Sequence, residues 1–301
     1  MNKAERITSF KNLSSRISQL SNTELESHLC SETPVHVGMG GTSYKMMIDN
    51  FPVFVKKIPL TDLERLPCNI RSTANLFKLP MCFQYGVGSK GFSAWRELEA
   101  HLITTGWVLS GQCPNFPMLY NWRIFDTEKP LPMNDEQRSS FERDIIYWEN
   151  SAAIQQRYEA IHNASAHLVL FSEYIPQTLH DWMNTIIKNT EKCDQASFAI
   201  VNAVQQIQST VQFMKTQEFI HFDAHLENIA TDGQGLYFTD FGLSLSEHFD
   251  FSPDEHIFFQ NHYSYDECST SINILHSLTK NMFGPAYNGR NDFKDKLSRD
   301  P

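Results

Sequence analysis

The most informative part of the sequence is HFDAHLEN at residues 221–228, followed by DFG at residues 240–242. Asp223 and Asn228 are five residues apart, and Asp240 follows Asp223 by seventeen residues. The short apolar runs around them predict strands, so these three polar side chains should gather near strand ends. Two carboxylates and an amide oxygen in one place can supply a base and two magnesium ligands. Each motif alone is common, but the two at this separation favour phosphoryl-transfer chemistry.

A glycine-rich segment lies upstream, where GMGGTS at residues 38–43 separates two predicted strands. Glycines allow backbone N–H groups to approach a phosphate closely. The segment is not a Walker loop, because no Lys-Ser or Lys-Thr follows the glycines, and not a Rossmann loop, because a strand follows it. A glycine-rich β-turn without a ligand is the alternative interpretation. The candidate nucleotide contacts in this segment are Gly38, Gly40, Gly41, Thr42 and Ser43.

A candidate cation for the phosphates follows in VFVKK at residues 53–57, which predicts a strand that ends in two lysines. Because neighbours in a strand point to opposite faces, only one of Lys56 and Lys57 can enter a cleft. Lys56 shares its face with Phe54. A strand that simply ends in solvated lysines is the alternative interpretation.

The composition limits the classes of protein that the chain can be. It has 301 residues, 41% of them hydrophobic and 20% charged, which suffices for one large domain or two lobes around a cleft. The formal charge of −10 argues against general nucleic-acid binding. No apolar run approaches the roughly 20 residues that cross a bilayer. The N-terminus also lacks the apolar core of a Sec signal peptide.

The cysteines and histidines follow no metal-site pattern. The six cysteines are never closer than 14 residues, so we expect reduced thiols rather than zinc ligands or disulfides. The twelve histidines match neither HExxH nor zinc-finger spacing, which argues against a zinc site. We therefore expect a cytoplasmic protein, although delivery into another cell would leave no mark in these features.

The pattern of the sequence divides the chain into three parts. Residues 1–33 are polar with weak helical spacing and predict a helical or partly ordered leader. Residues 34–175 are rich in predicted strands, including 35–39, 45–49 and 53–58, with a predicted helix at 95–109 and insertions at 59–92 and 126–166. Residues 176–301 show helical periodicity, at 179–187 and 196–215 above all, around the short strands that flank the two motifs, and a loop-rich stretch is expected up to about residue 265.

With these motifs in this order, the chain resembles the protein kinase superfamily over residues 35–283. The resemblance implies an α+β fold of two lobes, with an antiparallel β-rich N-lobe, a helical C-lobe, and ATP and Mg²⁺ between them. Lys56 corresponds to the phosphate-binding lysine of that family, and Asp223 corresponds to its catalytic base. Asn228 and Asp240 correspond to its magnesium ligands.

The resemblance places the partner of Lys56 on the next predicted helix. WRELE at residues 95–99 is similar to the regulatory helix of the small lobe. Glu97 is therefore the expected partner of Lys56, with Glu99 as the alternative. A solvated helix glutamate is the ordinary interpretation of either residue.

The resemblance also places the adenine site. Residues 170–183 are similar to the linker whose backbone binds adenine in that family. Within this linker the nucleotide contacts are expected at Glu173 and Ile175. Ser172 then takes the gatekeeper position, where a small side chain leaves a roomy back pocket.

The chain departs from the family pattern in several places. Lys56 and Glu97 are 41 residues apart, about twice the usual separation. Phe222 stands where many regulated kinases have Arg, and His225 stands where serine/threonine kinases usually have Lys. A His at that place resembles the aminoglycoside and choline kinase branch, which phosphorylates small molecules. Asp266, at the start of the last predicted helix, is either the residue that organises the large lobe or a simple N-cap.

The resemblance therefore implies a serine/threonine protein kinase that transfers the ATP γ-phosphate to a protein substrate. A small-molecule kinase and a nucleotide-binding pseudokinase are the alternatives, and neither nucleic acid nor a membrane is an expected partner. Residues 243–265 contain no Lys or Arg, so an added phosphate would find no local cation. We expect activity without activation-loop phosphorylation, or control by a partner that binds one of the insertions.

Overall fold

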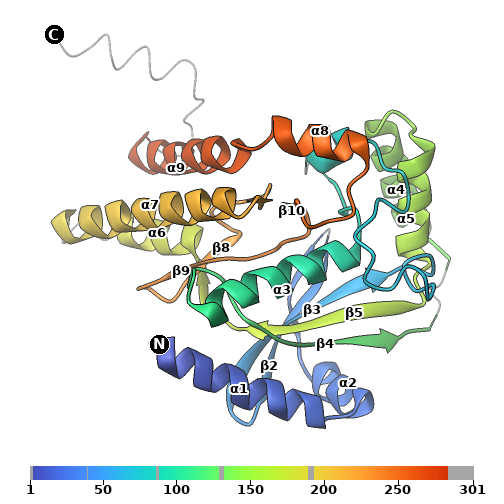
Figure 1. Ribbon diagram of the computed structural model, residues 1–301, viewed down its shortest axis with the longest axis horizontal. Coiled ribbons are helices and arrows are strands. Elements are labelled where there is room, and N and C mark those ends of the chain that lie inside the picture. The colour runs from blue at the N-terminus through green and yellow to red at the C-terminus, as the bar shows by residue number, and fades with distance from the viewer. Residues whose placement is uncertain (1–2, 39, 86–87, 129–131, 189–192, 284–301) are drawn as a thin grey trace.

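The centre of the molecule is a five-stranded antiparallel sheet in the order β1-β2-β3-β5-β4 (Figure 1). The computed structural model describes residues 3–38, 40–85, 88–128, 132–188 and 193–283. The strands of the sheet are β1 Pro34–Gly38, β2 Gly41–Ile48, β3 Phe51–Leu60, β4 Leu119–Asp126 and β5 Ala166–Glu173. The expected α+β class with an antiparallel sheet is confirmed.

Tight turns connect the first three strands. Asp49 and Asn50 link β2 to β3, and both have positive φ angles, 48° and 67°, as a two-residue hairpin turn requires. β2 begins at Gly41, four residues earlier than the sequence pattern predicts. Gly41 has a φ of 132°, and a Cβ atom there would collide with the carbonyl oxygen of Lys57. This close approach of two strands explains the need for glycine at that position.

Two helices, α1 (Lys3–Gln19) and α2 (Asn22–Cys30), cover one face of the sheet (Figure 1). Leu13 and Ile17 of α1 belong to one buried apolar cluster with Val53 and Val55 of β3 and Phe171 of β5. The expected leader is therefore a packed pair of helices over the part of residues 1–33 that the structure describes.

Helix α3 (Ala94–Ser110) packs against the opposite face of the sheet. Ser93 caps its N-terminus by accepting the Trp95 N–H, and Gly111 ends it with a left-handed φ of 78°. The side chains of Trp95 and Leu98 pack among apolar residues of β3 and β5. The predicted helix at 95–109 is thus present, almost to the residue.

The alternation of side chains along β3 decides which lysine faces α3. Val53 and Val55 lie in the cluster under α1 and α2, whereas Ile58 lies in the cluster under α3. Lys56 has the same parity as Ile58 and so points toward α3. Lys57 shares the other face with the valines.

The two insertions pack against each other. The second contains α4 (Asp135–Tyr147) and α5 (Ala152–His162), and the first contains a 3₁₀ helix at Met81–Tyr85. Arg157 of α5 and Glu64 of the first insertion form a buried ion pair, with 3.0 Å between Nη1 and Oε2. The apolar core shared by the two includes Phe77, Phe83, Phe92, Ile145, Ile154 and Tyr158. The insertions therefore form one structural unit, which we call the insertion unit.

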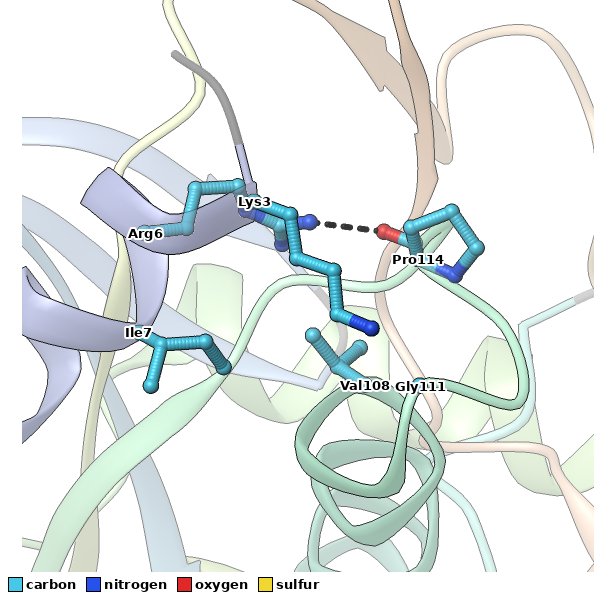
Figure 2. A pocket seen from close by; sticks show the side chains of 6 residues that line it. All are labelled: Lys3, Arg6, Ile7, Val108, Gly111 and Pro114. Carbon is cyan, nitrogen blue, oxygen red and sulfur yellow. Dashed lines mark hydrogen bonds between the residues drawn. The ribbon is translucent and has the colours of Figure 1, made fainter.

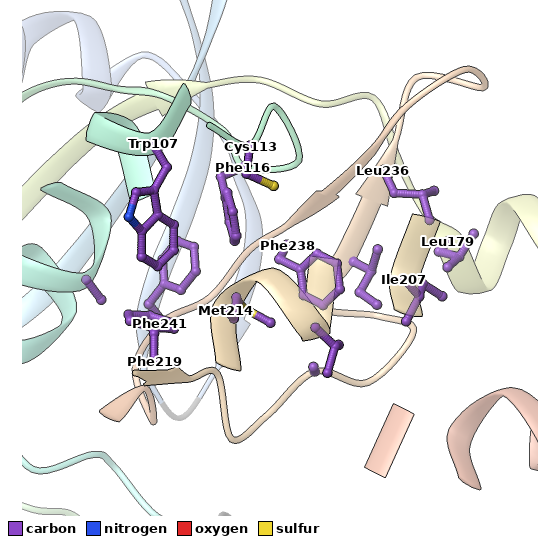
Figure 3. Close-up of a cluster of buried hydrophobic side chains, with 14 of the residues drawn as sticks. Trp107, Cys113, Phe116, Leu179, Ile207, Met214, Phe219, Leu236, Phe238 and Phe241 are labelled. Carbon is purple, nitrogen blue, oxygen red and sulfur yellow. The ribbon is translucent and has the colours of Figure 1, made fainter. Parts of the chain in front are cut away.

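The remaining helices form a second packed region beyond α3 (Figure 1). It contains α6 Leu179–Lys188, α7 Cys193–Thr216, α8 Pro253–Asn261, α9 Tyr265–Phe283 and the short strands β6 Gln177–Thr178, β7 Phe219–Ile220, β8 Ile229–Thr231, β9 Leu236–Phe238 and β10 Leu245–Ser246. Figure 3 shows its core, where Trp107 of α3 lies near Phe219 and Phe241. The prediction of a loop up to about residue 265 was wrong, because α8 lies within it. No helix in the described residues is long and apolar enough to span a bilayer.

Candidate active site

An ion cluster joins β3, α3 and the DFG segment, with Lys56 and Glu97 buried and Asp240 about half exposed. Lys56 Nζ lies 2.6 Å from Glu97 Oε1 and 2.8 Å from Asp240 Oδ1. The side chains of Lys56 and Glu97 are only 8% and 3% exposed. Glu99, the alternative partner, instead accepts a hydrogen bond from Arg71 Nε at 2.7 Å. The structure thus brings together the three predicted residues and decides between the two glutamates.

A single cation between two carboxylates sets their protonation. Burial disfavours the Lys56 ammonium, but Asp240 and Glu97 outweigh it and raise the pKa of Lys56 above its ordinary value. Burial also disfavours the Asp240 carboxylate, yet Lys56 lowers the pKa of Asp240 to about 2. Burial raises the pKa of Glu97 to about 7, against the attraction of Lys56. Asp240 is therefore the fully charged carboxylate of the cluster at neutral pH.

The glycine-rich turn lies directly over Lys56. A Cβ atom built at Gly40 would lie only 3.3 Å from Lys56 Nζ, tighter than most side chains tolerate. Ser43 of β2 is paired with Lys56 in the β2–β3 register. The other predicted contacts flank Gly40 in β1 and β2: Gly38, Gly41 and Thr42. A phosphate held by this turn would meet the charge of Lys56.

The HFDAHLEN segment forms the connection from β7 to β8, with Asp223 at its centre. Asn228 Nδ2 donates to the Asp223 carbonyl oxygen at 3.0 Å and to Asp223 Oδ2 at 2.9 Å. His225 Nε2 lies 3.7 Å from Asp223 Oδ1. Burial, reinforced by the charge of Asp240 and opposed by His225, raises the pKa of Asp223 to about 6. A carboxylate in this state can accept a proton near neutral pH.

Asp266 of α9 anchors this loop. Its Oδ2 accepts the His221 N–H at 2.6 Å, and its Oδ1 accepts the Phe222 N–H at 2.9 Å. Phe222 has a φ of 66°, so the backbone bends there into the left-handed region. The sequence left Asp266 either as an organising residue or as an N-cap. The structure supports the first role, because both carboxylate oxygens bind the loop.

A row of buried rings connects the loop to α3. The ring centroids of His221 and Phe241 are 5.3 Å apart, and those of Phe241 and His101 are 4.7 Å apart. Burial lowers the pKa of His221 to about 4 and that of His101 to about 3, so both rings are neutral at pH 7. Phe241 is therefore held between α3 and the loop. This packing fixes the position of Asp240, its neighbour in the chain.

A second buried ion pair fastens α3 to the segment that follows DFG. Arg96 Nη2 lies 2.5 Å from Glu255 Oε1 of α8, and the two side chains are 3% and 2% exposed. Arg96 Nε also donates to the Thr73 carbonyl oxygen at 2.6 Å. The sequence showed no cation within this segment, and the structure supplies one from α3. Because Arg96 precedes Glu97, the pair also helps to hold Glu97 in place.

The insertion unit lies against the DFG segment. Gly91 has a φ of 70°, and a Cβ atom there would lie 2.7 Å from the Gly242 carbonyl oxygen. Gln84 Nε2 donates to the carbonyl oxygen of Leu243 at 2.5 Å. These contacts give the first insertion a place beside the site, which the sequence did not indicate.

Phe222 packs in an aromatic cluster instead of meeting a charged partner. Its ring stacks on Tyr265 with centroids 4.0 Å apart and planes at 5°. It also lies 5.7 Å from Phe258 of α8 and 5.9 Å from Tyr85 of the insertion unit. Tyr85 Oη in turn lies 2.6 Å from His262 Nε2. Aromatic packing therefore links the loop, α8 and the insertion unit at this position.

Arg6 of α1 fastens the end of β5, where the sequence predicted the adenine contacts. Its Nε and Nη2 donate to Oε1 and Oε2 of Glu173 at 2.9 and 2.7 Å. It also donates to the carbonyl oxygens of Pro114 and Phe116 at 2.9 and 2.8 Å. The side chain of Glu173 is therefore bound to Arg6, and the expected nucleotide contact concerns its backbone. The sequence did not predict this role of Arg6, because residues 1–33 are mostly polar and Arg6 resembles any exposed arginine there.

The other predicted linker residues lie beside this anchor. Ser172 is only 3% exposed, next to Glu173 in β5, and Ile175 is half-buried two residues beyond the strand. A pocket of about 70 Å³ lies between α1 and the end of α3, next to Arg6 (Figure 2). Small-molecule sites are usually above roughly 300 Å³, so this pocket is a packing gap that is too small for a nucleotide.

No protein-family profile matches this chain, and no curated protein is significantly similar to it.

Proposed function

We propose that the chain has the two-lobed fold of protein kinases and transfers the γ-phosphate of ATP to a serine or threonine hydroxyl of a protein. The observation that carries the proposal is the ion cluster in which the buried Lys56 pairs with both Glu97 and Asp240. In this proposal the sheet and α3 form the small lobe, and α6 to α9 form the large lobe. The segment after β5 is the linker between them.

The residues present fit ATP and magnesium. Magnesium prefers oxygen ligands, and Asp240 offers a carboxylate that is ionised throughout the physiological range. The amide nitrogen of Asn228 binds Asp223, so the amide oxygen of Asn228 is the atom that would bind the metal. Lys56 and the turn around Gly40 would hold the phosphates. Bound magnesium would neutralise part of the phosphate charge.

Asp223 is the proposed base. Its carboxylate is oriented by Asn228 and lies within 3.7 Å of the His225 ring. Its raised pKa, about 6, leaves it ionised at pH 7 and able to accept the proton of a hydroxyl. Asp266 holds the backbone just before it and so fixes where this carboxylate lies.

One observation favours a second candidate, a kinase of small molecules. His225 stands two residues after Asp223, as in the aminoglycoside and choline kinase branch, and its ring faces Asp223. A pseudokinase that binds ATP without transferring phosphate is the third candidate. The presence of all five polar groups, Lys56, Glu97, Asp223, Asn228 and Asp240, favours catalysis over this last candidate.

The test is incubation of the purified chain with γ-labelled ATP, magnesium and a protein mixture, read by gel and mass spectrometry. We expect label on protein serines or threonines. In Asp223→Asn the rate of phosphate transfer should fall by about 10²-fold or more. Lys56→Met should abolish transfer, whereas Lys57→Met, on the other face of the same strand, should retain it. Label only on small molecules would favour the second candidate. ATP binding without any transfer would refute the proposed enzyme.

A further inference from the structure

A second pocket, of about 570 Å³, opens beside the proposed base. It lies between α6, α9 and residues 225–227 of the loop that carries Asp223. His225 both lines this pocket and lies 3.7 Å from Asp223. Of the described residues that line the pocket, none belongs to the cluster around Lys56. The pocket therefore lies next to Asp223 and apart from the cluster around Lys56.

The charges that line this pocket are opposite to those of the chain as a whole. Lys188 of α6 and Lys280 of α9 line it from two sides, against one carboxylate, Glu227. Three imidazoles, those of His180, His225 and His276, add further hydrogen-bond donors. The whole chain has a formal charge of −10. A cationic pocket on an acidic protein favours an anionic ligand over a basic one.

His225 adds a donor at the point where the pocket meets Asp223. The Glu227 N–H donates to His225 Nδ1 at 3.3 Å, so the ring hydrogen is on Nε2. That Nε2 is the atom nearest Asp223. The pocket therefore has a ring N–H next to Asp223, in addition to the two lysines.

We infer that this pocket binds the acidic flank of a protein acceptor, a serine or threonine near aspartates and glutamates in the chain. The inference rests on the proposed function and names its substrate class. The volume of this pocket is within the range of small-molecule sites, but such sites are mostly apolar, whereas every lining residue here except Leu226 has a polar side chain, and they come from three elements. A charged peptide segment fits such a surface, with its carboxylates directed to Lys188 and Lys280.

Binding can be tested without catalysis. A fluorescent peptide with one serine among aspartates and glutamates is titrated with the chain and compared with the same peptide carrying asparagines and glutamines. We expect the acidic peptide to bind about tenfold more tightly at low salt, and the difference to shrink in high salt. Lys188→Ala/Lys280→Ala should lower the affinity for the acidic peptide by about 5- to 20-fold. Lys11→Ala, an exposed lysine of α1, is the matched control and should change nothing.

The charge-reversed variant Lys188→Glu/Lys280→Glu separates electrostatic recognition from a structural role. It should prefer a peptide in which lysines replace the acidic residues, and ATP binding should stay at the parental level. Equal binding of acidic and neutral peptides would overturn the inference. An affinity for the acidic peptide that is unchanged in Lys188→Ala/Lys280→Ala would also overturn it. If inorganic phosphate binds through the lysines and the acidic peptide does not, the pocket serves a small anion and the inference is also wrong. Phosphate transfer to neutral proteins would leave the proposed function standing in each of these cases.

Discussion

Glu255→Gln should destabilise the protein far more than an ordinary surface substitution. The side chain of Glu255 is 2% exposed and is paired with Arg96, which is 3% exposed. Glutamine keeps the size of the side chain. It also preserves the α8 capping box, because glutamine can accept the Ser252 N–H that Glu255 now accepts at 2.9 Å. The substitution therefore removes the charge and the oxygen that accepts from Arg96, because the single amide oxygen is used by Ser252.

The magnitude follows from what Arg96 would lose. Three aromatic rings surround its guanidinium, with centroids 5.1 to 5.7 Å from Cζ, so water cannot easily replace the carboxylate. Burial already lowers the pKa of Arg96, against the attraction of Glu255. Loss of one partner from a buried pair typically costs about 3–5 kcal/mol, because an uncompensated charge remains. We expect a loss of that size in the free energy of unfolding.

Urea denaturation, followed by circular dichroism, measures this loss. Glu99→Gln is the matched control, because Glu99 lies on the same helix as Arg96 but pairs with the half-exposed Arg71. The free energy of unfolding of this control should fall by less than about 1 kcal/mol. Arg96→Met/Glu255→Gln should recover much of the stability, because the buried charge is then gone.

Glu255→Gln has a second expected effect, on catalysis. At a temperature where the variant is fully folded, its phosphate-transfer rate should fall about tenfold or more, because α3 no longer holds Glu97 at Lys56 as firmly. Stability within 1 kcal/mol of the parent, equal to that of Glu99→Gln, would refute the reasoning. So would a double variant that is less stable than Glu255→Gln alone.

Three further predictions concern the proposed active site. The transfer rate should fall as the pH drops through 6, because Asp223 must be ionised to accept a proton and its pKa is raised to about 6; an unchanged rate at pH 5 would show that Asp223 is not the base. Asp240→Ala should remove the magnesium dependence of ATP binding in calorimetry, whereas Asp126→Ala, at the end of β4, should retain it. Phosphatase-treated protein should be as active as untreated protein, because Glu255 already supplies the carboxylate that Arg96 binds; inactivation that rephosphorylation reverses would contradict this.

Local sequence patterns predicted most of the elements. Alternation along β3 put Lys56 and Lys57 on opposite faces, and helical spacing predicted α3 and α7 almost to their ends. α8 was missed because its apolar residues form no clear stripe. A usable signal was present: Ser252 followed by proline and, three residues on, Glu255 is a capping box. Short strands such as β10 have too few residues to show any period.

Local spacing along the chain identified the residues that could take part in the candidate site, since it defines the two motifs and the strand lysine. Only the tertiary structure decided that Glu97 and not Glu99 meets Lys56, and that Arg96 meets Glu255, 159 residues away. It also decided that Arg6 binds Glu173 and that the two insertions share one core. The physical reason is that periodicity reports only the face on which a side chain lies. The pairing of buried charges depends on how distant elements pack, because each buried ion needs a partner to offset its lost hydration.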